Sequence, residues 1–131
     1  MKKYYSAQRV EYLKTEKQII SLSKGWLLDN SKLPNSYKSH YFTDLEQSSM
    51  ADAYGWFIFK IMKTVPGSER LSINHKFTIN DSINQPITNY SRFIFDKEFN
   101  LLGMYYSFDS TDVKYNTFNY TIENWKTRFG H

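Results

Sequence analysis

The chain has 131 residues, no cysteine and a formal net charge of +4 at neutral pH. The absence of cysteine excludes disulfide bonds, thiolate metal sites and cysteine nucleophiles, and it is compatible with a reducing, cytoplasmic setting. Aromatic residues make up 18% of the chain, and disordered proteins contain few of them, so we expect a folded protein. A chain of this length can bury one core, which predicts a single soluble domain over residues 1–131.

The positive charge is concentrated in the N-terminal third of the chain. Residues 1–40 hold eight Lys or Arg against three acidic residues. The longest strongly apolar run, residues 55–59, is far shorter than the roughly 20 residues that span a bilayer. No apolar stretch follows the basic N-terminus, as it would in a secretory signal. We therefore expect no membrane partner.

The first predicted element is a helix over about residues 7–24. Ser6 has the side chain of a helix cap, and Gly25 has the backbone freedom that ends many helices. The stretch over residues 29–40 is rich in Asn, Ser and Pro, and we expect a loop there.

A second helix is predicted over about residues 43–63. Its start, Thr43-Asp44-Leu45-Glu46, matches the capping box, in which the Thr side chain caps a backbone N–H and the Glu side chain reaches back. Gly55 lies inside this helix, where glycine costs roughly 1 kcal/mol relative to alanine.

Three strands are predicted in the second half of the chain. Apolar and polar residues alternate over 71–80, which is the period of a half-buried strand. Turn-forming residues over 80–86 and 96–100 separate this strand from two more, at about 87–95 and 101–108. Because the connections are short, the strands should form an antiparallel meander.

The C-terminal segment completes the predicted fold. Residues 113–120 are interpreted as a fourth strand, with a helix as the alternative that the pattern leaves open, and a short helix over about 122–128 should follow, capped by Thr121. The fold class is therefore α+β, with two N-terminal helices followed by a three- or four-stranded antiparallel meander and a short C-terminal helix.

The register of the two hairpins decides which side chains share a face of the sheet. Apolar residues stay together if Ile79 pairs with Ile87 and Phe95 pairs with Leu102. The expected inner face then consists of Leu71, Ile73, His75, Phe77, Ile79, Phe93, Phe95, Leu102, Met104, Tyr106 and Phe108.

One polar row crosses this inner face. In the expected register His75 lies opposite Ser91, Ser91 lies opposite Tyr106, and Asn89 lies nearby. In one interpretation, which we favour, these groups hydrogen-bond one another and order the core. In the other they line a pocket, where a histidine could transfer protons near neutral pH.

Two basic surfaces are candidates for binding a macromolecule. On the outer sheet face, Lys76, Tyr90, Arg92 and Tyr105 would place cations among aromatic rings, an arrangement that holds phosphates and stacks bases. The alternative is that they form ordinary cross-strand pairs. The second surface is the N-terminal segment, with Lys2, Lys3, Arg9, Lys14, Lys17 and Lys24.

Local catalytic and cofactor motifs are missing from the sequence. His40, His75 and His131 lack the spacing of metal ligands, and the sequence contains neither a glycine-rich phosphate loop nor a nucleophile elbow. We therefore expect no metal and no cofactor, and the sequence favours a non-enzymatic function.

Three functional hypotheses follow. The first is a small non-enzymatic binding protein that acts on another macromolecule, with a protein partner favoured. The second is nucleic-acid binding through either basic surface. The third is a small-molecule pocket or enzyme around His75, Ser91 and Tyr106.

Overall fold

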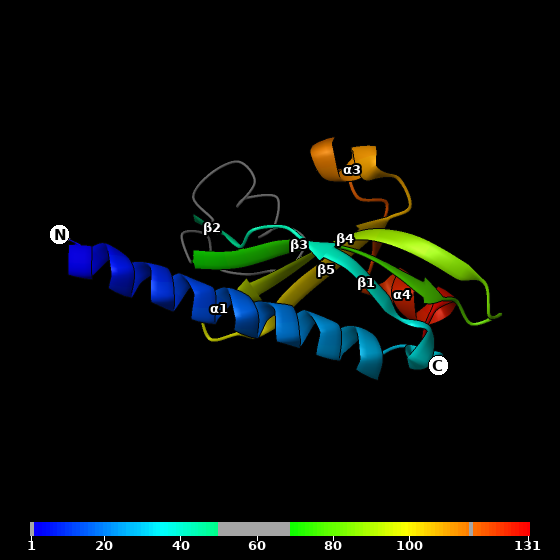
Figure 1. The fold of residues 1–131 in the computed structure, drawn as a ribbon. Coiled ribbons are helices and arrows are strands. Elements are labelled where there is room, and N and C mark those ends of the chain that lie inside the picture. The colour runs from blue at the N-terminus through cyan, green and yellow to red at the C-terminus, as the bar shows by residue number, and fades with distance from the viewer. Residues whose placement is uncertain (1, 50–68, 116) are drawn as a thin grey trace.

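The structure is a computed structural model that describes residues 2–49, 69–115 and 117–131 (Figure 1). The described elements confirm the predicted α+β class: three α-helices, one short 3₁₀ helix and a six-stranded antiparallel sheet. In chain order they are α1 (Lys2–Asp29), the 3₁₀ helix (Pro34–Ser36), β1 (Lys38–Phe42), β2 (Glu46–Ser49), β3 (Glu69–Asn80), β4 (Pro86–Asp96), β5 (Leu101–Ser107), α3 (Ser110–Tyr115), β6 (Tyr120–Thr121) and α4 (Ile122–Arg128).

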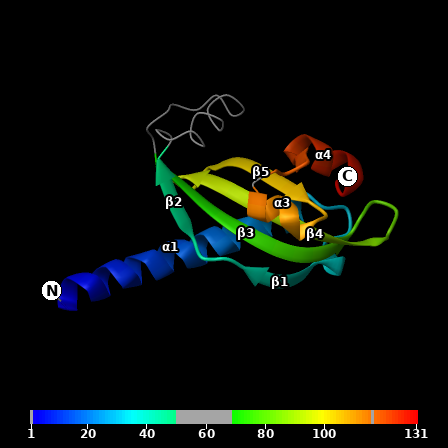
Figure 2. The same ribbon diagram turned by 90° about the horizontal axis from the view of Figure 1, so that it is seen from above.

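The two faces of the sheet have different neighbours. The strands lie in the order β1-β3-β4-β5-β6, and β2 extends the β1 edge by pairing with the first residues of β3. Helices α1 and α4 lie against one face, whereas α3 lies over the other (Figure 1). The first turns of α1 project past the strands in both views (Figure 2).

The core fills the space between the sheet and the layer of α1 and α4. Helix α1 contributes Ile19, Ser23 and Leu27 to the core, and because they recur every four residues they share one helix face. From α4 it takes Trp125 and Phe129, whose rings stack at a centroid distance of 4.2 Å. From the sheet it takes alternate residues, namely Leu71, Ile73, Phe77, Ile79, Phe93, Phe95, Met104 and Tyr106.

Helix α1 is longer than the sequence predicts at both ends, because it begins at Lys2, so that Ser6 lies inside it, and continues through Gly25 to Asp29. Leu27 is fully buried, and the ring of Trp26 packs edge-on against Phe93 at a centroid distance of 6.1 Å. Burying such side chains stabilises the helix by more than the roughly 1 kcal/mol that an internal glycine costs. Among the described residues, no helix combines the length and the apolar character that crossing a membrane requires.

The helix predicted from Thr43 is wrong where the structure describes it, because Glu46–Ser49 is strand β2. Thr43 makes its hydrogen bonds with β3. Its N–H donates to the Asn74 carbonyl at 2.9 Å, and its Oγ1 accepts from the Asn74 N–H at 3.0 Å. The groups that would cap a helix are thereby used in the sheet. The rest of that prediction, residues 50–63, lies outside the described residues.

The connection between β1 and β2 is tied to α1 through Leu45. The Leu45 N–H donates to Glu16 Oε2 at 3.0 Å, and the Tyr12 hydroxyl donates to the Leu45 carbonyl at 3.0 Å. Burial, with the neighbouring Glu16 carboxylate, raises the pKa of Tyr12. Two helix side chains thus satisfy both backbone groups of a buried residue that lies between two strands.

The strands β3, β4 and β5 form the predicted meander, with one correction. Phe95 pairs with Leu101, not with Leu102, because a bulge shifts the register after Ile94. A bulge places one extra residue in a strand and twists it locally. The other predicted pairs are confirmed: Ile79 with Ile87, His75 with Ser91, and Ser91 with Tyr106.

The fourth strand predicted over 113–120 is wrong for most of its length. Asp109 begins a turn, since its carboxylate accepts the Thr111 N–H at 3.0 Å, and α3 follows. The predicted loop over 29–40 likewise contains the 3₁₀ helix and the start of β1. The C-terminal helix is confirmed, with Thr121 as its N-cap and the Thr121 N–H donating to Asn124 Oδ1 at 2.9 Å.

Candidate functional site

The polar row predicted on the inner face lies in the core. His75, Ser91, Asn89 and Tyr106 are each at most 1% exposed. The ring of Phe42 lies parallel to that of His75 at a centroid distance of 3.7 Å. The ring centroids of Phe77 and Tyr37 lie 4.9 and 5.9 Å from that of His75, so the histidine packs among aromatic rings, as a core residue does.

Both ring nitrogens of His75 have partners. Nδ1 lies 2.8 Å from the Tyr41 carbonyl oxygen, which can only accept, so Nδ1 carries the proton and donates. Nε2 accepts from the Tyr37 hydroxyl at 2.6 Å. Burial lowers the pKa of His75 to about 4, and the ring is neutral near pH 7. With both nitrogens engaged, the ring ties β1 and the segment before it to β3.

The remaining members of the row do not form a proton relay with the His75 ring. Ser91 Oγ donates to the His75 backbone carbonyl at 2.8 Å, and burial raises the pKa of Tyr106 to about 12. Asn89 Nδ2 donates to the Ile87 carbonyl at 3.1 Å. The row therefore orders the sheet through bonds to the backbone and to β1, and not through bonds among its own side chains.

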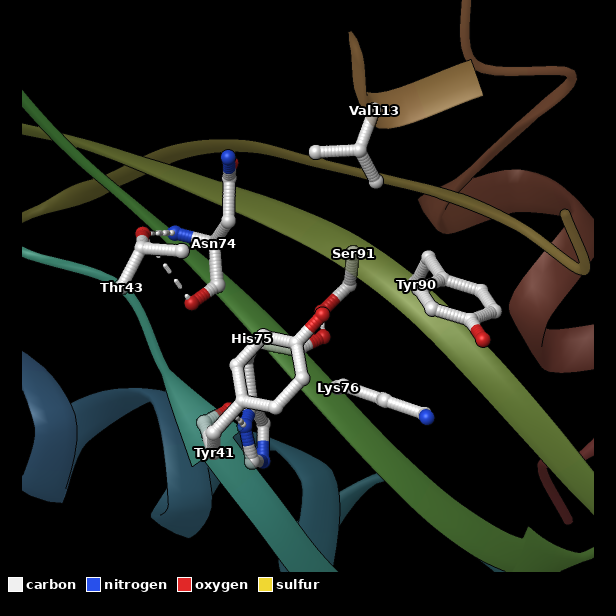
Figure 3. Close-up of a pocket in the computed structure, with 8 residues that line it drawn as sticks. All are labelled: Tyr41, Thr43, Asn74, His75, Lys76, Tyr90, Ser91 and Val113. Atoms are coloured by element: carbon white, nitrogen blue, oxygen red, sulfur yellow. Dashed lines mark hydrogen bonds between the residues drawn. The ribbon is translucent and has the colours of Figure 1, made fainter. Parts of the chain in front are cut away.

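On the outer face, Lys76 lies between two tyrosine rings (Figure 3). Its Nζ is 5.4 Å from the ring centroid of Tyr90 and 6.0 Å from that of Tyr41. A cavity of about 20 Å³ next to them is also lined by His75 and Ser91 of the polar row and by Val113 of α3. It has room for about one water molecule. The surface is thus a platform of cation and rings and not an organic-ligand pocket.

Arg92 and Tyr105, the other predicted members of this face, are register partners on β4 and β5. Arg92 Nε donates to Asn74 Oδ1 at 2.8 Å, and its guanidinium lies 5.4 Å from the ring centroid of Phe118. Arg92 is therefore held in place by the neighbouring strand and covered in part by an aromatic ring.

The basic residues of the N-terminal segment all belong to α1, which lies on the other side of the sheet from α3 (Figure 1). Lys76 shares a cavity lining with Val113 of α3 (Figure 3). Lys14 and Lys17 are exposed, whereas Lys24 is half-buried, with its Nζ 5.8 Å from the ring centroid of Phe42. The two predicted basic surfaces are consequently separate. The backbone of Lys2, Lys3 and Arg9 is helical, but their side chains lie outside what the structure describes.

An apolar groove that the sequence did not reveal lies between α1 and the hairpin of β4 and β5. It encloses about 290 Å³ and is lined by Leu22, Trp26, Phe95, Phe99 and Leu101, together with Ser21, Gly25 and Asp29. Gly25 contributes to the open space, since a Cβ at that position would meet no atom within 4 Å. We call this feature the apolar groove.

Phe99 reaches the groove from an unfavourable backbone conformation. Its φ angle is +67°, in the left-handed region that glycine adopts without strain. A three-residue hairpin loop commonly carries glycine at such a position, and a non-glycine residue in the left-handed region costs on the order of 1 kcal/mol or more. The other hairpin has Asn84 at a φ of +64°, a residue type that tolerates this region. An aromatic ring is thus kept at the groove despite the strain.

The groove was missed because its two sides are distant in sequence. Residues 21–29 belong to a helix and residues 95–101 to a hairpin, and no periodicity links them. The available signal was Phe99 itself, a large apolar residue in the middle of a polar turn, Asp96-Lys97-Glu98-Phe99-Asn100.

Within the described ranges, no three or more His, Asp or Glu side chains gather in a way that could hold a metal ion. Comparisons of the chain with protein-family models, curated proteins and solved structures found no match.

Proposed function

We propose that the protein is a non-enzymatic binding module that uses the apolar groove to bind another protein. The observation that carries this proposal is Phe99, whose ring lines the groove at the expense of a left-handed backbone. Residues with backbone strain of this kind cluster at functional sites, where the surrounding structure holds them in place. Trp26 and Phe99 are aromatic residues, which are enriched in protein interfaces, and tryptophan is among the residues that contribute most to binding energy.

The character of the groove favours a protein over a small molecule. A small-molecule site encloses most of its ligand and directs several polar groups at it. Here the polar side chains in the lining are those of Ser21 and Asp29, and Leu22 is 38% exposed at the rim. An open, mostly apolar surface of this kind suits the side chains of a protein partner.

A pair of substitutions on α1 tests the proposal. A displayed library of random twelve-residue peptides is selected on the wild-type protein, and the enriched peptides are measured against Leu22→Glu and Leu28→Glu. Both leucines are partly exposed, at 38% and 42%, but Leu22 lines the groove and Leu28 does not. We expect binding at least ten-fold weaker for Leu22→Glu and unchanged for Leu28→Glu, because a charge in the groove must be desolvated.

Phe99→Gly separates binding from stability. Glycine relieves the strained backbone, which offsets the loss of the half-buried ring, so we expect a thermal midpoint close to that of the wild type. Peptide binding should still fall at least ten-fold. Failure of the library to enrich any peptide, or equal binding by all three variants, would overturn the proposal.

A second candidate function is single-stranded nucleic-acid binding on the outer face, which the position of Lys76 between Tyr41 and Tyr90 favours. Labelled single-stranded DNA is titrated at two salt concentrations. We expect affinity that falls steeply with salt and a further loss in Lys76→Glu, but not in Lys126→Glu, which alters an exposed lysine of α4. Affinity that is equal in the two variants would exclude this surface.

A further inference from the structure

A second hollow adjoins the apolar groove along the edge of β5. It encloses about 270 Å³ and is lined by residues 102–105 of β5 and residues 121–123 at the start of α4. Leu101 lines the apolar groove and Leu102 lines this hollow, so the two features meet at consecutive residues. Together they border the part of β5 that precedes its pairing with β6.

The edge of β5 is incompletely paired in the described part of the chain. On one side, all of β5 lies next to β4. On the other side, β6 pairs with Tyr105 and Tyr106, and no strand of the described residues pairs with residues 101–104. A bulge interrupts this stretch, because Leu102 is the extra residue between the pairs Ile94–Gly103 and Phe95–Leu101. On either side of the bulge, some backbone groups of residues 101–104 point away from β4, as they do in an edge strand.

We propose that this edge receives an extended segment of the partner protein as an added strand, which continues the line of β6. This inference rests on the proposed function and specifies the form of the partner. The open edge of four residues corresponds to about 14 Å, at roughly 3.4 Å per residue. Strand addition supplies affinity through main-chain hydrogen bonds and specificity through pockets for alternate side chains.

The linings define the chemistry of the added segment. Alternate side chains on one face of it would enter the apolar groove, beside Trp26 and Phe99, and these should be large and apolar. Gly103 has no side chain to obstruct the approach to the edge. One exposed carboxylate lies in each lining: Asp29 in the apolar groove and Glu123 in the second hollow. No Lys or Arg belongs to either lining. The segment should therefore carry Lys or Arg flanking its apolar residues, and a nucleic acid is disfavoured here.

The test modifies the peptide and leaves the protein intact. Peptides enriched by wild-type selection are remade with a single backbone N-methyl group at each successive position, which removes one N–H donor at a time. We expect affinity to fall at least ten-fold at alternate positions and to remain unchanged at the positions between them. Hydrogen exchange at the amides of residues 101–104 should slow in the complex. Glu123→Lys should weaken binding several-fold at low salt, whereas Glu11→Lys on exposed α1 should not.

The possible results distinguish strand addition at β5 from the proposed binding of a protein in the apolar groove. If N-methylation at every position of the peptide leaves its affinity unchanged, strand addition is overturned. If such a peptide still fails to bind the Leu22→Glu variant, the groove remains a binding site. A library that enriches no peptide would overturn both. A wild-type chain that forms a dimer, with residues 101–104 protected from exchange, would assign the edge to a second copy and overturn the proposed partner.

Discussion

Trp125→Ala is expected to lower the free energy of unfolding by about 3–5 kcal/mol, measured by urea denaturation at pH 7. The ring is fully buried and lies 4.2 Å from that of Phe129 and 5.3 Å from that of Tyr106, centroid to centroid. Its Nε1 donates to the Asn30 carbonyl at 3.1 Å. Alanine would leave a cavity and an unsatisfied acceptor where α4, α1 and the sheet meet.

Thr127→Ala provides the matched control, since Thr127 is exposed on the same helix and its replacement should change stability by less than about 0.5 kcal/mol. A loss below 1 kcal/mol in Trp125→Ala would show that α4 is not part of the cooperative core.

His75 is expected to make the protein less stable as the pH falls from 6.5 to 5. Its pKa is about 4 in the folded chain, from burial, and about 6.5 when unfolded. Below pH 6.5 the unfolded state binds a proton that the folded state excludes. The stability contributed by the neutral ring is therefore complete above pH 6.5 and is lost progressively toward pH 4. The loss by pH 5 should be about 2 kcal/mol.

Urea denaturation at several pH values measures this dependence, and two variants assign it. His75→Gln has no titrating ring in the core, so its stability should change less between pH 6.5 and 5, on top of a loss from the altered packing. His40→Gln removes an exposed histidine whose Nε2 lies 2.7 Å from Thr78 Oγ1, and it measures what a second histidine contributes to the slope. An equal slope in wild type and His75→Gln would contradict the neutral, buried histidine described above.

The two proposed binding surfaces lie on different parts of the molecule. The apolar groove and the open edge of β5 adjoin one another beside α1, whereas Lys76, Tyr41 and Tyr90 occupy the outer face of the sheet. Substitutions in one surface should therefore leave the other unaffected, because residues without shared partners act additively. This independence allows both binding hypotheses to be tested on one protein preparation.

Local patterns were sufficient for the central sheet. The alternation over 71–80 and the turns that follow predict three strands and most of their register, because a one-residue slip would expose every apolar side chain. The cap at Thr121 likewise predicts the start of α4, since that signal lies within four residues of the helix. The same register correctly predicted that Lys76 and Tyr90 face each other across β3 and β4.

Residue patterns were therefore enough to predict the α+β class, the meander and the gathering of His75, Ser91 and Tyr106 on its inner face. Tertiary structure alone decided that Thr43 bonds β3 instead of capping a helix, because the same hydroxyl serves either purpose. It also decided the continuation of α1 through Gly25 and the formation of the apolar groove. These features depend on contacts between segments that are remote in the chain, and such contacts leave no periodic signal in the sequence.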